Sequence, residues 1–449
     1  MAQLIFPNDF RWGAATSSYQ IEGAYADDGK GESVWDRFTR IPYHIENNET
    51  ADISIDHYHH MLDDVQLMKQ VGLKNYRFSI CWPRILPDGR GKKNAKGIDF
   101  YNRLVDQLLE NGIQPNVTLN HWDFPQALQE NGGWLSRDSV DWFADYARVV
   151  FDILGDRVKL WSTHNEPWVI AFLGFQIGIF PPGICDTSAA YQVTHHLLMS
   201  HGKAVQVFRQ GGYTGEIGIV LNLPRFEPAS TNQADIDAFR RVYQNFYNLY
   251  LDPIFFGHYP HDLMNWLGYH QPKQEANDLD LISQPIDFLG VNHYSTEVVS
   301  YSLHGGSLKN KNQPVSAPGW GKTAMNWGIN PSGLMDVLLD LKDNFNNPVV
   351  YITENGTALE DVPDDQGVVR DWGRINYLRD HLRAVYTAIH QGANVKGYYV
   401  WSLWDNFEWA SGYRPRFGII YVDYESLKRT PKQSALWYSQ VVAENGITT

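Results

Sequence analysis

Two glutamates lie where the sequence could place a pair of carboxylates on opposite sides of a cleft. Glu166 lies in the segment Thr163–Pro167 and Glu354 in the segment Ile352–Gly356, and each follows a short apolar run typical of a buried strand. Such a pair can cleave a glycosidic bond, because one group protonates the departing oxygen while the other attacks the anomeric carbon or activates water. The alternative for each glutamate alone is a structural role, in which it caps a helix or pairs with an arginine.

These glutamates need strands to hold them, and the chain offers eight short runs of apolar, β-branched or aromatic residues. Most runs are apolar on both faces, as buried parallel strands are. Longer amphipathic segments separate them, and several of these end at a glycine, which is a helix stop signal. The predicted strands are Phe10–Thr16, Asn75–Ser79, Gln114–Leu119, Lys159–Thr163, Glu216–Leu221, Phe288–Val291, Val349–Thr353 and Val395–Trp401, and the predicted helices include Asp56–Val71, Gly97–Asn111, Ser136–Leu154 and Arg374–Gln391.

The alternation of strand, loop and helix predicts an α/β fold, a single (β/α)8 TIM barrel over residues 1–449 with extended loops on its catalytic face. Chemistry in this fold sits at the C-terminal ends of the strands. The ends of the fourth and seventh strands face each other across the barrel mouth, which brings the two glutamates together. Polar and aromatic residues stand at or near most strand ends, namely Gln20, Arg77, His121, Trp122, Asn165, Asn222, Asn292, Tyr294, Asn355 and Trp401.

The amino-acid composition limits the kinds of molecule that the protein is expected to bind. The chain has 51 Asp and Glu against 37 Lys and Arg, a net charge of −14, which argues against binding to nucleic acid or to an anionic membrane surface. No apolar run is long enough to span a bilayer. The 16 Trp and 25 Tyr indicate either a rich core or stacking platforms for sugar rings. We therefore expect a small uncharged substrate.

Cysteine and histidine usage predicts no metal, no cofactor and a reducing compartment. Two cysteines, Cys81 and Cys185, cannot make a disulfide framework. The first residues show no basic and apolar pattern of a signal peptide, so we expect a cytoplasmic protein. His57, His59 and His60 are close in sequence, but no zinc-binding pattern follows them. No glycine-rich phosphate loop is visible.

A series of motifs runs in order along essentially the whole chain, and together they make the sequence resemble glycoside hydrolase family 1, the β-glucosidase family. Any one of them alone would be a weak signal, but their order and their positions at strand ends are specific. The motifs are Phe10–Thr16, Ser18–Gly23, Arg77–Ser79, His121–Asp123, Asn165–Pro167, Thr353–Gly356 and Trp401–Trp409.

The resemblance implies a retaining mechanism. Glu354 would be the nucleophile and Glu166 the acid/base, with the two carboxyl groups about 5–5.5 Å apart. Arg77 and Tyr294 match the positions that stabilise the ionised nucleophile. The pKa of Glu166 would be raised by the charge on Glu354 and by partial burial.

The resemblance also implies a set of sugar-binding residues. Asn165 would bind the 2-hydroxyl, Trp401 would form a stacking floor, and Glu408 with Trp409 would bind the 4- and 6-hydroxyls. A carboxylate at position 408 would repel a phosphate dianion, which favours unphosphorylated glycosides. The full predicted set is Gln20, His121, Trp122, Asn165, Asn292, Trp401, Glu408, Trp409 and Phe417, and Trp327 is predicted to bind the substrate on its leaving-group side.

The predicted activity is hydrolysis of terminal β-D-glucosyl residues from small glycosides and cello-oligosaccharides. Three alternatives stay open at this stage. One is a silent carbohydrate-binding barrel, one is a metal-dependent barrel hydrolase, and one is an enzyme whose main reaction is glycosyl transfer. Activity on β-galactosides and β-fucosides, the natural leaving group and the oligomeric state are also left open.

Overall fold

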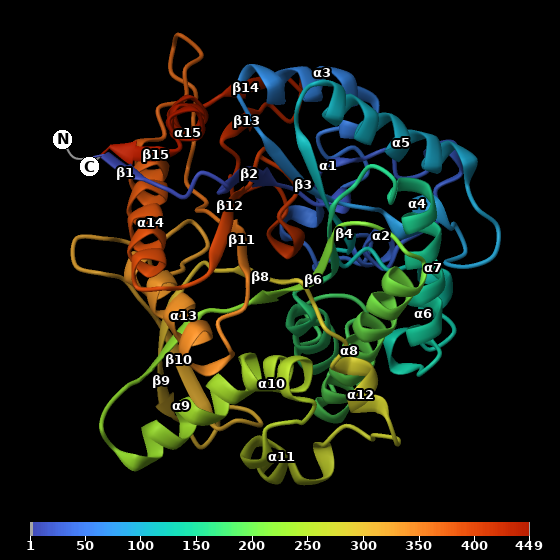
Figure 1. Ribbon diagram of the computed structural model, residues 1–449, viewed down its shortest axis with the longest axis vertical. Coiled ribbons are helices and arrows are strands. Elements are labelled where there is room, and N and C mark those ends of the chain that lie inside the picture. Colours follow the sequence, from blue (N-terminus) through green and yellow to red (C-terminus); the bar gives the residue numbers. More distant parts are fainter. Residues whose placement is uncertain (1–2, 449) are drawn as a thin grey trace.

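The computed structural model describes residues 3–448 and is built around a closed barrel of eight parallel strands (Figure 1). The predicted (β/α)8 barrel is therefore confirmed, and each predicted strand corresponds to one barrel strand. In the order in which they pair around the barrel, starting from the N-terminal one, the strands are β2 Arg11–Ala15, β3 Asn75–Ser79, β4 Gln114–Asn120, β5 Leu160–Asn165, β6 Glu216–Asn222, β8 Phe288–Asn292, β11 Val350–Asn355 and β12 Val395–Trp401.

Helices connect successive strands and cover the outside of the barrel (Figure 1). Their apolar stripes face the strands, as in the amphipathic α5, where Phe100, Leu104 and Leu108 are buried. The four predicted helices are present with ends shifted by up to three residues. The main helices are α3 His57–Gln70, α5 Ala95–Glu110, α7 Ser139–Leu154, α8 Thr187–Gln210, α13 Pro331–Asn344, α14 Trp372–His390 and α15 Gln433–Glu444.

Several barrel strands run further than their apolar runs predict. β5, β6, β8 and β11 extend into the polar residues Asn165, Asn222, Asn292 and Asn355. The ladder explains the difference, because Asn222 pairs with Asn292 and Glu354 pairs with Asn292 across neighbouring strands. Backbone pairing continues for as long as the barrel wall continues, whatever the side chain. The amide side chains at these positions are thus fixed on rigid strands.

The two long inserts carry additional helices and a small sheet. The first holds β7 Arg225–Pro228, α9 Gln233–Phe246, α10 Asn248–Phe256, α11 His261–Leu267 and α12 Asp278–Ile282, and the second holds β9 Thr296–Tyr301 and β10 Asn310–Val315. The strands β10, β9 and β7 form a three-stranded sheet. Figure 1 shows α9, β9 and β10 side by side at the lower left of the molecule.

The first and last strands of the described chain pair with each other. Strand β1 Gln3–Ile5 pairs antiparallel with β15 Gly446–Thr448 (Figure 1). Across residues 3–448, no helix is both long and apolar enough to cross a membrane. In the same residues, no group of three or more His, Cys, Asp or Glu is placed to hold a metal ion, and Cys81 and Cys185 are unpaired.

Candidate active site

A cavity of about 430 Å³ opens at the C-terminal ends of the barrel strands. Both Glu166 and Glu354 lie on its wall, together with most of the predicted sugar-binding side chains. Loop and helix residues from the inserts complete the entrance. The lining residues that were predicted from the sequence are His121, Trp122, Glu166, Asn292, Tyr294, Trp327, Glu354, Trp401, Glu408, Trp409 and Phe417.

Glu354 lies inside strand β11 and is held by two donors. The Arg77 guanidinium donates from Nη1 to Oε1 at 2.6 Å, and the Tyr294 hydroxyl donates to Oε2 at 2.6 Å. Glu354 is only 3% exposed. Each oxygen of the carboxylate thus has its own short, charge-assisted hydrogen bond, which favours the ionised form and fixes the orientation of the group.

Arg77 is positioned by strand β3 in the centre of the barrel. It is fully buried and donates from Nη2 to Asn165 Oδ1 at 2.8 Å and from Nε to Thr118 Oγ1 at 3.2 Å. An arginine buried without a carboxylate would be costly, so the ion pair with Glu354 is required for the barrel interior as well as for the site. The chemistry and the fold therefore depend on the same contact.

Glu166 has a neutral hydrogen-bond partner. The amide of Asn292 donates to its Oε1 at 2.6 Å. The hydroxyl of Thr353 donates to Asn292 Oδ1 at 2.8 Å, which turns the amide nitrogen towards Glu166. Burial, followed by the negative charge of Glu354, raises the pKa of Glu166 to about 8.

The two carboxyls therefore have different environments although they share a cavity. Burial raises the pKa of Glu354 too, but Arg77, Tyr294 and Asn292 all oppose that rise. Glu166 has no such ion pair among the described residues, so the shared proton resides on Glu166. One acid and one anion across a cleft is the arrangement that glycosidic bond cleavage requires.

A chain of hydrogen bonds fixes the tautomer of His121. Asn165 Oδ1 accepts from Arg77, so its amide nitrogen faces His121 Nε2 at 3.1 Å. His121 Nε2 is then the acceptor and Nδ1 carries the hydrogen. Burial and the Arg77 charge lower the pKa of His121 well below its usual range, which keeps the ring neutral. Nδ1 has no partner among the described residues. It is a donor free for a ligand hydroxyl.

Part of the cavity wall is a group of aromatic rings that pack on one another. The His121 ring stacks on Trp401 with 5.7 Å between the ring centroids and on Trp409 with 6.1 Å. Trp122 packs against Trp409 at 4.4 Å. These rings present flat apolar faces, while polar groups such as Glu408 stand at their margin. That combination suits a sugar ring, whose faces carry C–H groups and whose rim carries hydroxyls.

Burial and the charge of Glu354 raise the pKa of Glu408 to about 8. Gln20 Nε2 lies 3.3 Å from Glu408 Oε2. The predicted sugar contacts Gln20 and Asn165 are fully buried, and they lie directly behind the cavity wall rather than on it. Their roles as direct ligands stay predictions.

Ion pairs between buried charged side chains hold the loop that follows β12. Asp405 accepts from Lys432 Nζ at 2.8 Å and from Arg416 Nη1 at 2.8 Å, and Lys432 also contacts Asp361 at 2.5 Å. Asp405 and Lys432 are both fully buried. This cluster anchors the segment that carries Glu408 and Trp409, so a loop position becomes as fixed as a strand position.

Three residues of the cavity wall adopt positive φ angles, which residues other than glycine rarely adopt. The angles are 47° at Glu166, 81° at Trp122 and 50° at Trp409. Such conformations cost roughly 1–3 kcal/mol each and persist where the surrounding structure enforces them, often at active sites. Glu166 is followed by a π-helical segment, Val169–Ile177, another feature frequent at functional sites.

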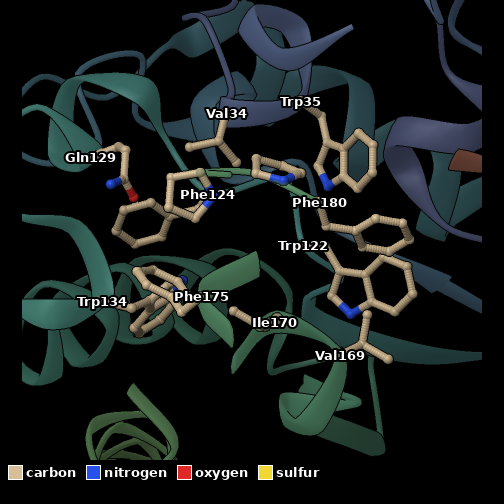
Figure 2. Close-up of a pocket in the computed structure, with 12 residues that line it drawn as sticks. Val34, Trp35, Trp122, Phe124, Gln129, Trp134, Val169, Ile170, Phe175 and Phe180 are labelled. Atoms are coloured by element: carbon tan, nitrogen blue, oxygen red, sulfur yellow. The ribbon is translucent and has the colours of Figure 1, made fainter. Parts of the chain in front are cut away.

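A second cavity lies behind Trp122 and is lined mainly by aromatic and aliphatic side chains. Figure 2 shows Trp35, Phe180 and Trp122 on one side of it and Phe124 and Trp134 on the other. It offers only about 20 Å³, room for about one water molecule. Because its wall is almost entirely apolar, we interpret it as a packing gap behind the aromatic wall and not as a ligand site.

Residues 2–447 match the family described as "Glycosyl hydrolase family 1". The chain belongs to glycosyl hydrolase family 1. It is 48% identical over 447 residues to a 1,4-beta-D-glucan glucohydrolase of Thermotoga neapolitana, with 99% of each chain covered. It is 47% identical to Beta-glucosidase A of Acetivibrio thermocellus, with 99% of this chain and 100% of that one covered. A beta-glucosidase from Thermotoga maritima in complex with castanospermine superposes with a TM-score of 0.95 at 47% identity, covering 99% of this chain and 100% of that one.

The motifs that identify family 1 gather at the inner end of the cavity. Many of the residues that line its entrance were not predicted from the sequence. The entrance side chains come from loops and inserts whose residues carry no periodic pattern, so no signal in a single sequence could have placed them. Asn222 was predicted at a strand end, whereas Ile179, Phe246, Ser295, Glu297 and Met325 were not predicted.

Proposed function

We propose that this retaining β-glucosidase releases terminal β-D-glucosyl residues from small glycosides and cello-oligosaccharides, with Glu354 as nucleophile and Glu166 as acid/base. One observation carries the assignment of roles. Arg77 and Tyr294 hold both oxygens of Glu354, whereas Glu166 has an amide partner and a pKa raised to about 8. The anion attacks and the acid protonates, because those are the protonation states in which the site holds them.

In the first step, Glu354 attacks the anomeric carbon while Glu166 donates its proton to the departing oxygen. A covalent glucosyl-enzyme forms and the leaving group departs. Loss of the charge on Glu354 lowers the pKa of Glu166, since that charge was one of the causes of the raised value. Glu166 can then accept a proton from water, which attacks the same carbon and releases glucose with its β configuration retained.

The predicted sugar contacts suit a glucosyl ring placed against the aromatic wall. His121 offers a neutral Nδ1 donor, and Glu408 offers an acceptor beside Gln20. Asn292, already bonded to Glu166, also donates to Asn165, the residue predicted to bind the 2-hydroxyl. The described residues that line the cavity include Glu166, Glu297, Glu354 and Glu408 but no lysine or arginine. Anionic glycosides, including 6-phosphorylated ones, would be poor substrates.

Cysteine chemistry supports a cytoplasmic enzyme. Cys185 is exposed and unpaired, and Cys81 is buried and unpaired. An exposed thiol is maintained in a reducing compartment and oxidises elsewhere.

The test is turnover of p-nitrophenyl β-D-glucoside by the wild type and by Glu354→Ala, with and without azide. We expect rapid release by the wild type and almost none by the variant. Azide fits the space that the carboxylate leaves, so it should restore turnover and give the α-glucosyl azide by a single inversion. A Glu354→Ala enzyme that keeps most of its activity would disprove the assignment of the nucleophile. A wild type inactive on gluco-, galacto- and fuco-substrates would favour a silent sugar-binding barrel.

A further inference from the structure

The leaving-group end of the cavity differs from the sugar end in being mostly apolar. Trp168 stacks on Phe246 with 4.1 Å between ring centroids, and Trp327 packs near Tyr294 at 5.2 Å. Leu173, Ile179, Phe180 and Met325 complete this part of the wall. An entrance of this kind would by itself favour aryl or alkyl leaving groups, because apolar surface gains most from apolar partners.

Glu297 interrupts this apolar wall. It lies on β9, whose neighbour β7 pairs Phe226 with Glu297 in register. Phe226 packs on Phe246 at 5.0 Å, and Phe246 in turn stacks on Trp168. Glu297 thus stands beside the Trp168–Phe246 stack, away from the rings of the sugar end. Among the described lining residues outside the catalytic pair and the sugar end, it is the only ionisable one apart from Tyr294.

The carboxylate of Glu297 is held in place but is not saturated. Asn312 Nδ2 donates to Oε2 at 2.7 Å, and Asn310 donates to Asn312 Oδ1 at 2.6 Å, which fixes the direction of the Asn312 amide. That is the only hydrogen bond to the Glu297 carboxylate among the described residues, and no ion pair accompanies it. Burial raises its pKa, as expected for a carboxyl partly removed from water. A carboxylate has about four acceptor positions, so most of its capacity remains unused.

We propose that Glu297 is a specificity-determining residue that accepts hydrogen bonds from the hydroxyls of a sugar leaving group. An acceptor set among aromatic faces repeats the chemistry of the sugar end, where Glu408 stands beside Trp409. The inference rests on the proposed function, since it assigns what the same site accepts on the leaving-group side. A sugar in this place would satisfy the carboxylate while its ring faces contact Trp168 or Trp327.

The experiment compares two β-glucosides whose leaving groups are six-membered rings with and without hydroxyls. Glucose release from cellobiose and from cyclohexyl β-D-glucoside is measured for the wild type, Glu297→Gln and Glu297→Leu. We expect kcat/KM for cellobiose to fall by about ten- to hundredfold in Glu297→Leu, the effect of losing hydrogen bonds to a charged group. Glu297→Gln keeps an uncharged acceptor and should lose less. Cyclohexyl β-D-glucoside should be cleaved as well as before.

The matched control is Glu227→Gln, which removes a carboxylate from the neighbouring strand β7 outside the cavity. It should leave both substrates unaffected. An equal fall for both substrates in both Glu297 variants would show that Glu297 supports the fold, and no fall for cellobiose would show that it contacts no leaving group. Either result overturns the proposal while the glucosidase activity stands. A wild type that releases glucose from neither substrate would instead overturn the proposed function.

Discussion

The raised pKa of Glu166 predicts a pH dependence that a single substitution should abolish. In the free enzyme the acid must be protonated, so kcat/KM should fall as pH rises through about 8. A single group with a pKa of about 8 is about 90% protonated at pH 7 and about 10% protonated at pH 9, so kcat/KM should fall roughly tenfold between these two pH values. Glu166→Gln removes the titrating group, so the alkaline fall should disappear and the rate should be about 10²–10⁴ lower.

The assay is release of p-nitrophenolate from p-nitrophenyl β-D-glucoside between pH 5 and pH 10, with circular dichroism at each pH to confirm the folded state. Glu408 is the necessary control, because its pKa is also raised to about 8. In Glu408→Gln the sugar should bind less tightly, but the alkaline fall should remain. If the fall survives in Glu166→Gln and vanishes in Glu408→Gln, the acid has been assigned to the wrong carboxyl.

Three further predictions concern the groups around the pair. Glu408→Gln should raise the Tm relative to wild type at pH 9 but not at pH 4. The reason is that a carboxyl whose folded pKa lies near 8 contributes stability that is lost as pH rises from about 4.5 through 8. Equal shifts of Tm at both pH values would refute this prediction. Tyr294→Phe removes the 2.6 Å hydrogen bond to Glu354 and should lower kcat/KM by about ten- to hundredfold, measured with p-nitrophenyl β-D-glucoside; an unchanged value would exclude that role. Arg77→Met leaves a buried carboxylate without its cation and should reduce the free energy of unfolding by about 3–5 kcal/mol at pH 7 in urea titrations; Arg77→Lys, which keeps the charge, should lose less.

Much of the fold could be predicted because barrel strands are buried on both faces. Asn75–Ser79 and Val395–Trp401 were predicted with their observed bounds. Errors occurred where the strand continued into polar residues, as at Asn292. The end of an apolar run in the sequence marks the end of the buried core. The strand itself ends where its backbone stops pairing with its neighbours, and at an active site the strand continues beyond the apolar run.

The placement of Glu166 and Glu354 on one cavity could be predicted because both glutamates lie at strand ends, and strand ends are placed by the topology of the barrel. The motifs of Arg77 and Tyr294 carried over for the same reason, and the structure brings both to Glu354. Order along the chain was enough to bring these four side chains to one edge of the barrel.

The sequence by itself thus determined the barrel, the two carboxylates and the aromatic wall, since each depends on local pattern and on strand order. The family resemblance implied that Glu166 keeps the proton, but only the tertiary structure supplies the physical reason, because that depends on whether Arg77 or an amide lies within hydrogen-bonding distance of each carboxyl. It also decided that Glu297 enters the cavity. A side chain on an insert has no periodic signal, and its position follows from how β7, β9 and β10 pack beside the barrel.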